Sequence, residues 1–182
     1  WSAGDAVVRR PYFFDLRAPG GVALTRNHPP KEGADPTDHA DMHPGLWVAF
    51  GDISGVDFWR NKGPLVSVRN PLLPPQSAPG RGSFEVVSDY KQGERIICTE
   101  TCRYTFLVRP AGILIVIDST FRSEGGDFSF GDQEEMGLGV RVALEADIAP
   151  APLREPVDVR PVRVVARGAL AALERVVDDL PL

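Results

Sequence analysis

The sequence predicts an all-β protein, an antiparallel β-sandwich that carries one short helix near its C-terminal end. Seventeen prolines and eighteen glycines divide the 182 residues into short apolar runs, which favours many short strands joined by turns. β-branched and aromatic residues dominate Cys98–Phe121, as a half-buried pleated surface prefers. Nothing supplies the regular helical crossovers that a parallel sheet requires.

Eight segments are expected to form strands. They are Ala6–Leu16, Val22–Arg26, Pro64–Arg69, Ser83–Tyr90, Arg95–Arg109, Gly112–Arg122, Gly126–Phe130 and Gly137–Leu144. The tetrapeptide Arg109-Pro-Ala-Gly112 is the expected turn of a hairpin between two of them, because proline and glycine set the backbone angles that turns need.

The strand predicted over Arg95–Arg109 carries both cysteines. Cys98 and Cys102 would have Cα atoms about 13 Å apart on a strand, well beyond the roughly 7 Å limit for a disulfide. We therefore expect two reduced packing residues. Glu100 shares their face and is the odd member, expected near a mouth of the sandwich or paired with an arginine such as Arg122.

Two parts of the chain differ in composition. Residues 1–144 hold all the predicted strands, and we expect them to form the sandwich domain. In the tail, residues 145–182, glycine nearly vanishes while alanine, valine, arginine, proline and aspartate accumulate. Apolar residues recur at helical spacing in Gly168–Leu180, which predicts a short amphipathic helix.

Charge and hydropathy exclude two classes of function. The net charge is −5 and the basic residues form no long run, so a nucleic-acid partner is not expected. The longest apolar run, Gly112–Ile117, is far short of the roughly 20 residues that span a bilayer, so no membrane span is expected. The compartment and the oligomeric state stay open.

All three histidines fall in one predicted loop, Arg26–Gly45. They are His28, His39 and His43, interleaved with Asp35, Asp38 and Asp41 behind Arg26 and Asn27. Long loops in compact domains are usually functional or disordered, and histidine suits both proton transfer and metal binding. The alternative is a surface loop with capping aspartates and solvated histidines. We interpret the loop as functional.

The spacing His39-x3-His43 resembles a metal-binding pair on one face of a helix. Pro44 disfavours helical geometry at the residue before it, so a helical zinc pair is not expected. Metal binding by His39 and His43 with a distant carboxylate stays an alternative, since no closed four-ligand pattern is present.

An aromatic segment follows the loop. Trp47, Phe50, Phe58 and Trp59 alternate with Asp52, Asp57, Arg60 and Asn61. Aromatic faces beside carboxylates and amides suit a sugar ring, which has apolar faces and polar edges. The alternative is that these aromatic residues belong to the core.

The last predicted strand places two sets of residues on opposite faces. Leu138, Val140 and Val142 would point into the core. Glu135, Gly137, Gly139 and Arg141 would then share the other face, where the two glycines leave a cleared floor for a ligand. The alternative is an edge with a solvated Glu–Arg pair.

Three stretches resemble a known bacterial family. They are RPYFFDLRAPGGVALTRNHPP, TDHADMHPGLWVAFGDISGVDFWRNKG and FGDQEEMGLGVRVA, which together cover roughly Arg10 to Ala143 and resemble the family carried under the name "methane oxygenase PmoA". Its core motif is matched by Asp38, His39, His43, Pro44, Leu46 and Trp47, and a second motif by Asp132 through Arg141.

This resemblance has three implications. At fold level the family is similar to galactose-mutarotase-like supersandwiches, in which histidine and glutamate act on sugars. Family members continue through further strands that the tail does not match, so we expect an incomplete sandwich, through a frameshift or a truncation. The family name implies an iron- or copper-dependent oxygenase.

The leading hypothesis is an enzyme that acts on a carbohydrate-like small molecule. The predicted catalytic residues are His39, His43 and Glu135, and the predicted substrate-binding residues are Arg26, Asn27, His28, Asp38, Trp47, Asp52, Trp59 and Arg141. Epimerisation, hydrolysis and elimination all use such a set. The alternatives are a non-catalytic carbohydrate-binding sandwich and the oxygenase, whose ligands would be His39, His43 and Glu135. No particular cofactor is predicted.

Overall fold

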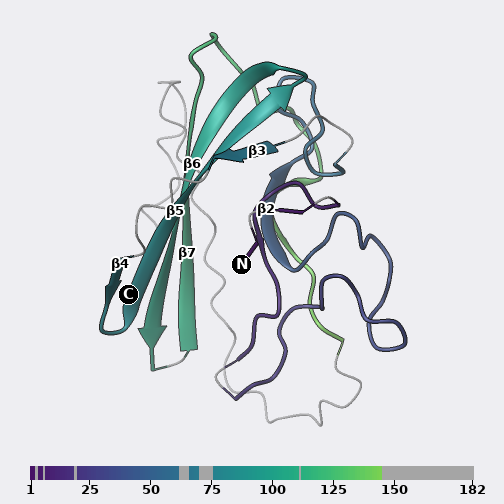
Figure 1. Cartoon of the computed structure of the whole chain (residues 1–182), viewed down its shortest axis with the longest axis vertical. Coiled ribbons are helices and arrows are strands. Elements are labelled where there is room, and N and C mark those ends of the chain that lie inside the picture. Colours follow the sequence, from purple (N-terminus) through teal and green to yellow (C-terminus); the bar gives the residue numbers. More distant parts are fainter. Residues whose placement is uncertain are drawn as a thin grey trace, which may run out of the picture.

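The computed structural model describes residues 1–144 except 3, 6, 19, 62–65, 70–75 and 111. Within these residues the chain forms eight strands in two antiparallel sheets and no helix, which confirms the predicted all-β sandwich (Figure 1). The helix predicted at Gly168–Leu180, and the tail that contains it, lie outside the described residues.

The larger sheet has the strand order β3-β5-β6-β7, and β4 also pairs with β5. Its strands are β3 (Val66–Arg69), β4 (Gln76–Ala78), β5 (Arg81–Gln92), β6 (Arg95–Arg109) and β7 (Gly112–Arg122). The bounds of β6 and β7 are those that the sequence predicted. Arg109 pairs with Gly112, which confirms the hairpin turn.

The smaller sheet has the order β1-β2-β8. Its strands are β1 (Tyr12–Phe13), β2 (Leu46–Phe50) and β8 (Met136–Val140). Two of the expected strands, Val22–Arg26 and Gly126–Phe130, form only isolated bridges, at Ala23, Thr25 and Phe130. The sequence analysis missed β2, because its five residues are all apolar and show no alternation.

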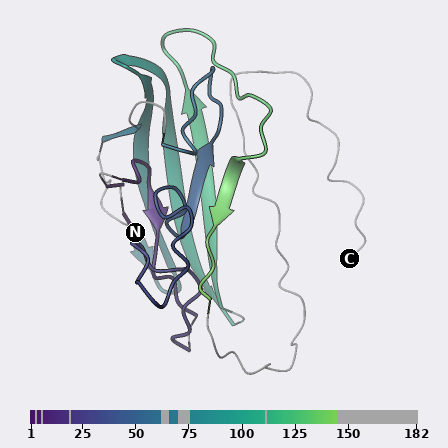
Figure 2. The same cartoon turned by 90° about the vertical axis from the view of Figure 1, so that its right-hand side faces the viewer.

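The core lies between the two sheets. Phe50 of the smaller sheet packs edge-on against Phe121 of the larger one, with ring centroids 5.4 Å apart, and Phe13 packs on Tyr104 at 5.0 Å. Figure 1 shows the two layers side by side, and Figure 2 shows the smaller sheet in front of the larger one. Cys98 and Cys102 are buried free thiols on β6, as predicted.

The face of β2 that points away from this core carries a third cluster. Trp47 and Ala49 pack there with Val8, Tyr12 and Trp59. Gly139 of β8 pairs with Trp47 across the strands, and a Cβ on Gly139 would lie 2.3 Å from the Trp47 ring. The space above Gly139, predicted as a cleared floor for a ligand, is therefore filled by Trp47.

The close approach of Gly139 to Trp47 gives a stability prediction. Gly139→Ala should lower the free energy of unfolding by about 1–3 kcal/mol, the usual cost of overpacking, because the surrounding rings leave the indole little room to move. Gly125→Ala is the control, since its nearest neighbours would be 4.0 Å away. Urea unfolding of both variants checks this, and equal stability of the two would contradict the packing.

The predicted inward face of β8 does not lie in the core. Leu138, Val140 and Val142 are 41%, 52% and 59% exposed. β8 is the edge strand of its sheet. Only Met136 at its start packs against the core, and the residues that follow on the same face are exposed. Across the described residues, no helix is long and apolar enough to cross a bilayer.

Candidate functional site

Arg26 holds the segment 26–45, which carries the three histidines and is called the histidine loop below, in shape from inside. Its side chain is fully buried. Nη1 donates hydrogen bonds to the carbonyl oxygens of Pro36 and Asp38, and Nη2 donates one to the carbonyl of His43, all at 2.8 Å. Burial, and secondly the charge of Arg141, lower the pKa of Arg26. Arg26 was predicted to bind substrate, but its side chain instead holds the loop in shape.

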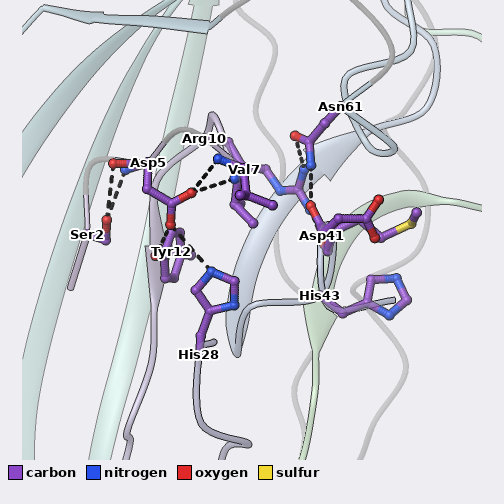
Figure 3. Close-up of polar contacts among 12 residues, drawn as sticks. Ser2, Asp5, Val7, Arg10, Tyr12, His28, Asp41, His43 and Asn61 are labelled. Atoms are coloured by element: carbon purple, nitrogen blue, oxygen red, sulfur yellow. Dashed lines mark hydrogen bonds and ion pairs between the residues drawn. The ribbon is translucent and has the colours of Figure 1, made fainter. Parts of the chain in front are cut away.

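Asn27 and His28 also make contacts within the scaffold. The Asn27 amide donates to Asp35 at 2.9 Å. The His28 ring packs edge-on against Tyr12 at 5.1 Å, and its Nε2 lies 3.4 Å from the Asp5 carboxylate, which also accepts a 2.7 Å hydrogen bond from the Tyr12 hydroxyl (Figure 3). Asn27 thus braces the loop internally, and His28 ties it to the N-terminal segment.

The other two histidines lie side by side. The His43 amide donates to the His39 carbonyl at 2.9 Å, a single helix-like turn that brings the ring centroids to 5.0 Å. The His43 ring stacks on Trp47 at 5.0 Å and 19°, and Trp59 packs edge-on against both. We call His39, His43, Trp47 and Trp59 the ring ladder.

The ring ladder runs from solvent into the cluster on the outer face of β2. The His39 side chain is 57% exposed, whereas Trp47 is 3% and Trp59 9% exposed. His39 adopts a left-handed backbone conformation, with φ of 49°, which non-glycine residues seldom adopt outside special sites. Neither tryptophan offers an open face to a sugar, because His43 already covers Trp47.

Arg10 closes the ring ladder from the N-terminal side. Its guanidinium lies 5.7 Å from the Trp47 ring centroid and donates to the carbonyls of Trp59, Phe58 and Met42 and to the Asn61 side chain. Figure 3 shows the guanidinium between the N-terminal segment and the turn that carries His43. Burial lowers the pKa of Arg10 to about 10.

The surroundings of His43 keep its imidazole unprotonated at neutral pH. Burial has the largest effect in lowering the His43 pKa, followed by the charges of His39, Arg141, Arg10 and Arg26. Each of these neighbours is cationic or can become so, and each would be repelled by an imidazolium. His43 is therefore a neutral base in the resting site.

Asp38 and Arg141 form an ion pair at the open side of the site. Arg141 Nη2 donates to Asp38 Oδ1, and Asp38 Oδ2 lies 3.4 Å from His39 Nδ1. Desolvation opposes ionisation of Asp38, but the Arg141 charge and the hydrogen bonds from His39 and Arg141 outweigh it and lower the Asp38 pKa. The ion pair thus joins the residue that follows β8 to the turn between His39 and His43.

Glu135 lies at the other end of β8. Its carboxylate pairs with Arg60 Nη2 at 2.5 Å, and Arg60 Nη1 contacts Asp57 at 3.0 Å. Arg141 follows Glu135 by six positions, which is about 20 Å along a strand. The carboxylate that the fold brings to the histidines is therefore Asp38, although Glu135 was predicted as their partner.

The comparisons with known proteins identify the family but no activity. A family model described as a family of unknown function, DUF6807, matches residues 2–169. The chain belongs to the DUF6807 family. No curated protein matches, and no solved structure matches either.

The DUF6807 match corrects the resemblance drawn from the sequence motifs. No model of the "methane oxygenase PmoA" family matches the chain, so that assignment is wrong. The likeness to galactose-mutarotase-like sandwiches stays a prediction, because no solved structure supports it. The oxygenase hypothesis loses its basis with the family name.

Two predictions for this DUF6807 protein remain, Asp52 as a substrate-binding residue and a metal ion at His39 and His43. Asp52 lies two residues beyond β2 and accepts a 2.6 Å hydrogen bond from the Gly55 amide, so it shapes a turn away from the ring ladder. In the part of the chain that the structure describes, no group of three or more histidine, cysteine or acidic side chains is placed to hold a metal ion. His39 and His43 therefore have no third ligand there.

Arg10 is a part of this DUF6807 site that could not be predicted from the sequence. Arg10 stands beside Arg9 in a short basic pair before Pro11, and nothing in this pattern distinguishes a buried guanidinium from an exposed one. Arg9 is exposed and Arg10 is 3% exposed. Arg10 could have been identified only if the alternation of buried and exposed residues before β1 had been visible in the sequence, and it was not.

Proposed function

We propose that this chain carries an acid–base site that acts on a carbohydrate or related polyol, with His43 as the general base. The observation that supports this most directly is the state of the His43 ring. It is half-buried, stacked on Trp47, and held in its neutral form first by burial and then by the surrounding positive charge. Among the described residues, no side chain or carbonyl hydrogen-bonds to its ring nitrogens.

A neutral imidazole with a free nitrogen can accept a proton from a ligand. Stacking on Trp47 fixes the ring plane, which reduces the orientational freedom that a proton transfer must otherwise overcome. Once protonated, His43 would face three arginines, so it would release the proton again readily. This is the behaviour that a turnover cycle requires of its base.

The neighbours of His43 take complementary roles. The exposed His39, with Nδ1 3.4 Å from Asp38, would return a proton to the ligand as the general acid. Arg141 is part-exposed and can donate hydrogen bonds to ligand oxygen atoms. Arg26 positions His43 through its carbonyl and does not reach the ligand.

The burial of the two tryptophans favours an enzyme over a carbohydrate-binding module. A binding module presents an open aromatic face to the sugar ring. Here Trp47 and Trp59 are almost completely buried, and the ring at the open end of the ring ladder is the imidazole of His39. The exposed groups are those of acid–base chemistry.

The experiment is a reaction screen of the full chain with sugars and polyols in D₂O, followed by NMR. Anomeric exchange reports mutarotation, deuterium incorporation at carbon reports epimerisation or elimination, and new anomeric signals report hydrolysis. We expect turnover in the wild type and a loss of about 10²–10⁴-fold in His43→Gln, the usual contribution of a general base. Arg103→Gln, on the far sheet, is the folded control.

The pH profile separates the base from a structural role. Because the His43 pKa is lowered, activity should persist below the ordinary histidine value of about 6.5 and fall only at more acidic pH. His43→Gln with full activity, or an acid-side loss of wild-type activity with its midpoint above about pH 6.5, would contradict the assignment.

A further inference from the structure

The arginines around His43 make few direct contacts with carboxylates. Three arginines surround it, and two of them are buried. Arg10 donates only to backbone carbonyls and to the Asn61 amide oxygen, and Arg26 donates only to backbone carbonyls. Within the described residues, neither guanidinium contacts a carboxylate.

Buried charges of this kind are costly unless an opposite charge compensates them. The carboxylate that contacts this cluster directly is Asp38, which is half-exposed and shared between Arg141 and His39. Asp57 and Asp41 act on Arg10, and Asp38 and Asp35 act on Arg26, only through space, with no hydrogen bond within the described residues. Burial is the largest cause of the lowered His43 pKa, and the charges of His39 and the three arginines add to it.

Arg141 is the arginine that a ligand can reach. Its side chain is 26% exposed, and Nη2 binds Asp38. In the described part of the chain, its Nε and Nη1 have no hydrogen-bond acceptor. A guanidinium with free donors in a fork matches the two oxygens of a carboxylate. Asp38 already shows that a carboxylate fits against this arginine.

The same charges weigh against the other ligand classes. A metal ion would be repelled by the arginines, and no three-ligand group stands in the described residues to hold one. A neutral sugar would bring no oxyanion to the free donors of Arg141. A carboxylate on the ligand would pair with them.

We propose that the ligand is an acidic carbohydrate, a sugar acid whose carboxylate binds to Arg141 beside Asp38 while a neighbouring hydroxyl or carbon–hydrogen group faces His43. This inference rests on the proposed function for the carbohydrate part of the ligand. The argument for the carboxylate on the ligand comes independently, from the free donors of Arg141. A sugar phosphate has the related oxyanion chemistry, and the experiment separates the two.

The test is calorimetric titration of the full chain with three groups of probes. The first is D-galacturonate, D-glucuronate and D-gluconate, the second is the neutral sugars galactose and glucose, and the third is galactose 6-phosphate and glucose 6-phosphate. We expect at least one sugar acid to bind tenfold or more tightly than its neutral counterpart and than the phosphates. No binding of any sugar acid, or equal binding of the neutral sugars, would overturn the inference. Tighter binding of a phosphate would overturn the choice of carboxylate.

Variants test the role of Arg141. Arg141→Gln should weaken sugar-acid binding at least tenfold, and Arg141→Lys, which keeps the charge but loses the fork, should weaken it less. Arg103→Gln, an exposed arginine paired with Glu85, is the matched control. If Arg141→Gln does not fold, the sugar-acid affinity of Arg141→Lys relative to the wild type still tests the role of Arg141. Unchanged binding in a folded Arg141→Gln would overturn the assignment.

The histidine signals give a second measurement. The chain has three histidines, so their NMR titrations can be resolved, and a bound carboxylate should raise the pH midpoint of His43. An unchanged midpoint with a sugar acid bound would place that ligand elsewhere. Binding of a sugar acid without turnover would support this inference and contradict the proposed function. Turnover of neutral sugars alone would support the proposed function and contradict this inference.

Discussion

Arg26→Met should lower the free energy of unfolding by about 3 kcal/mol and release the histidine loop from its folded shape. The three carbonyls of Pro36, Asp38 and His43 would lose their donor. Hydrogen bonds to a charged group contribute about 1.5–3 kcal/mol each. The three are not additive, and methionine removes the cost of a buried charge, so the net loss is smaller than their sum.

Urea unfolding gives the change in stability, and hydrogen exchange of the loop amides shows where it occurs. We expect faster exchange at the amides of Met42 and His43, which donate to the His39 carbonyl, while β6 and β7 keep their protection. Turnover should fall as well, because one of the three carbonyls that Arg26 holds belongs to His43, the proposed base.

Arg103→Met is the matched control for Arg26→Met. Arg103 is exposed and pairs with Glu85 on the larger sheet, and such surface pairs contribute about 0–1 kcal/mol. If both variants lose the same stability, or if the loop amides exchange no faster in Arg26→Met, the loop does not depend on its buried arginine.

The larger sheet could be predicted from the sequence because its strands are long and locally consistent. Over the fifteen residues of Arg95–Arg109 the buried and more exposed positions alternate from Cys98 to Tyr104, and the turn at Arg109–Gly112 joins this strand to the next one. The smaller sheet could not be predicted to the same degree. Two residues, Tyr12–Phe13, form all of β1, because the strand exists only where β2 offers partners.

The candidate site divides in the same way between local and distant contacts. His39 and His43 were expected together, and one turn of backbone brings their rings together. The burial of Arg26 depends on a loop that folds around it, and the partner of Asp38 stands 103 positions away in the chain. Residue types and spacing predict which groups take part, but not which of them face solvent.

Glu100 shows the same limit inside the core. It was expected near a mouth of the sandwich or beside Arg122, but it is buried on β6. It accepts hydrogen bonds from the Tyr90 hydroxyl at 2.8 Å and from the Ser119 hydroxyl at 2.6 Å. Burial raises the Glu100 pKa, and the two hydrogen bonds only partly oppose this.

Glu100→Ala and Glu100→Gln should therefore change stability in opposite directions. Alanine leaves a cavity and two hydroxyls without an acceptor, which should lower the free energy of unfolding by about 3 kcal/mol. Glutamine keeps an acceptor for Tyr90 and cannot ionise, so it should raise the free energy of unfolding at pH 7 by about 1 kcal/mol. Urea unfolding at pH 7 measures both.

The pH dependence of these variants identifies the cause. In the wild type the unfolded chain releases the Glu100 proton near pH 4.3, while the folded chain holds it to higher pH. The folded state is then favoured below that value and loses stability as pH rises through the folded pKa. Glu100→Gln has no such loss, so its advantage over the wild type should grow from pH 4 to pH 8. A glutamine variant that is less stable than the wild type throughout this range would mean that the core needs the carboxylate itself, with Tyr90 and Ser119 as the donors that keep it ionised.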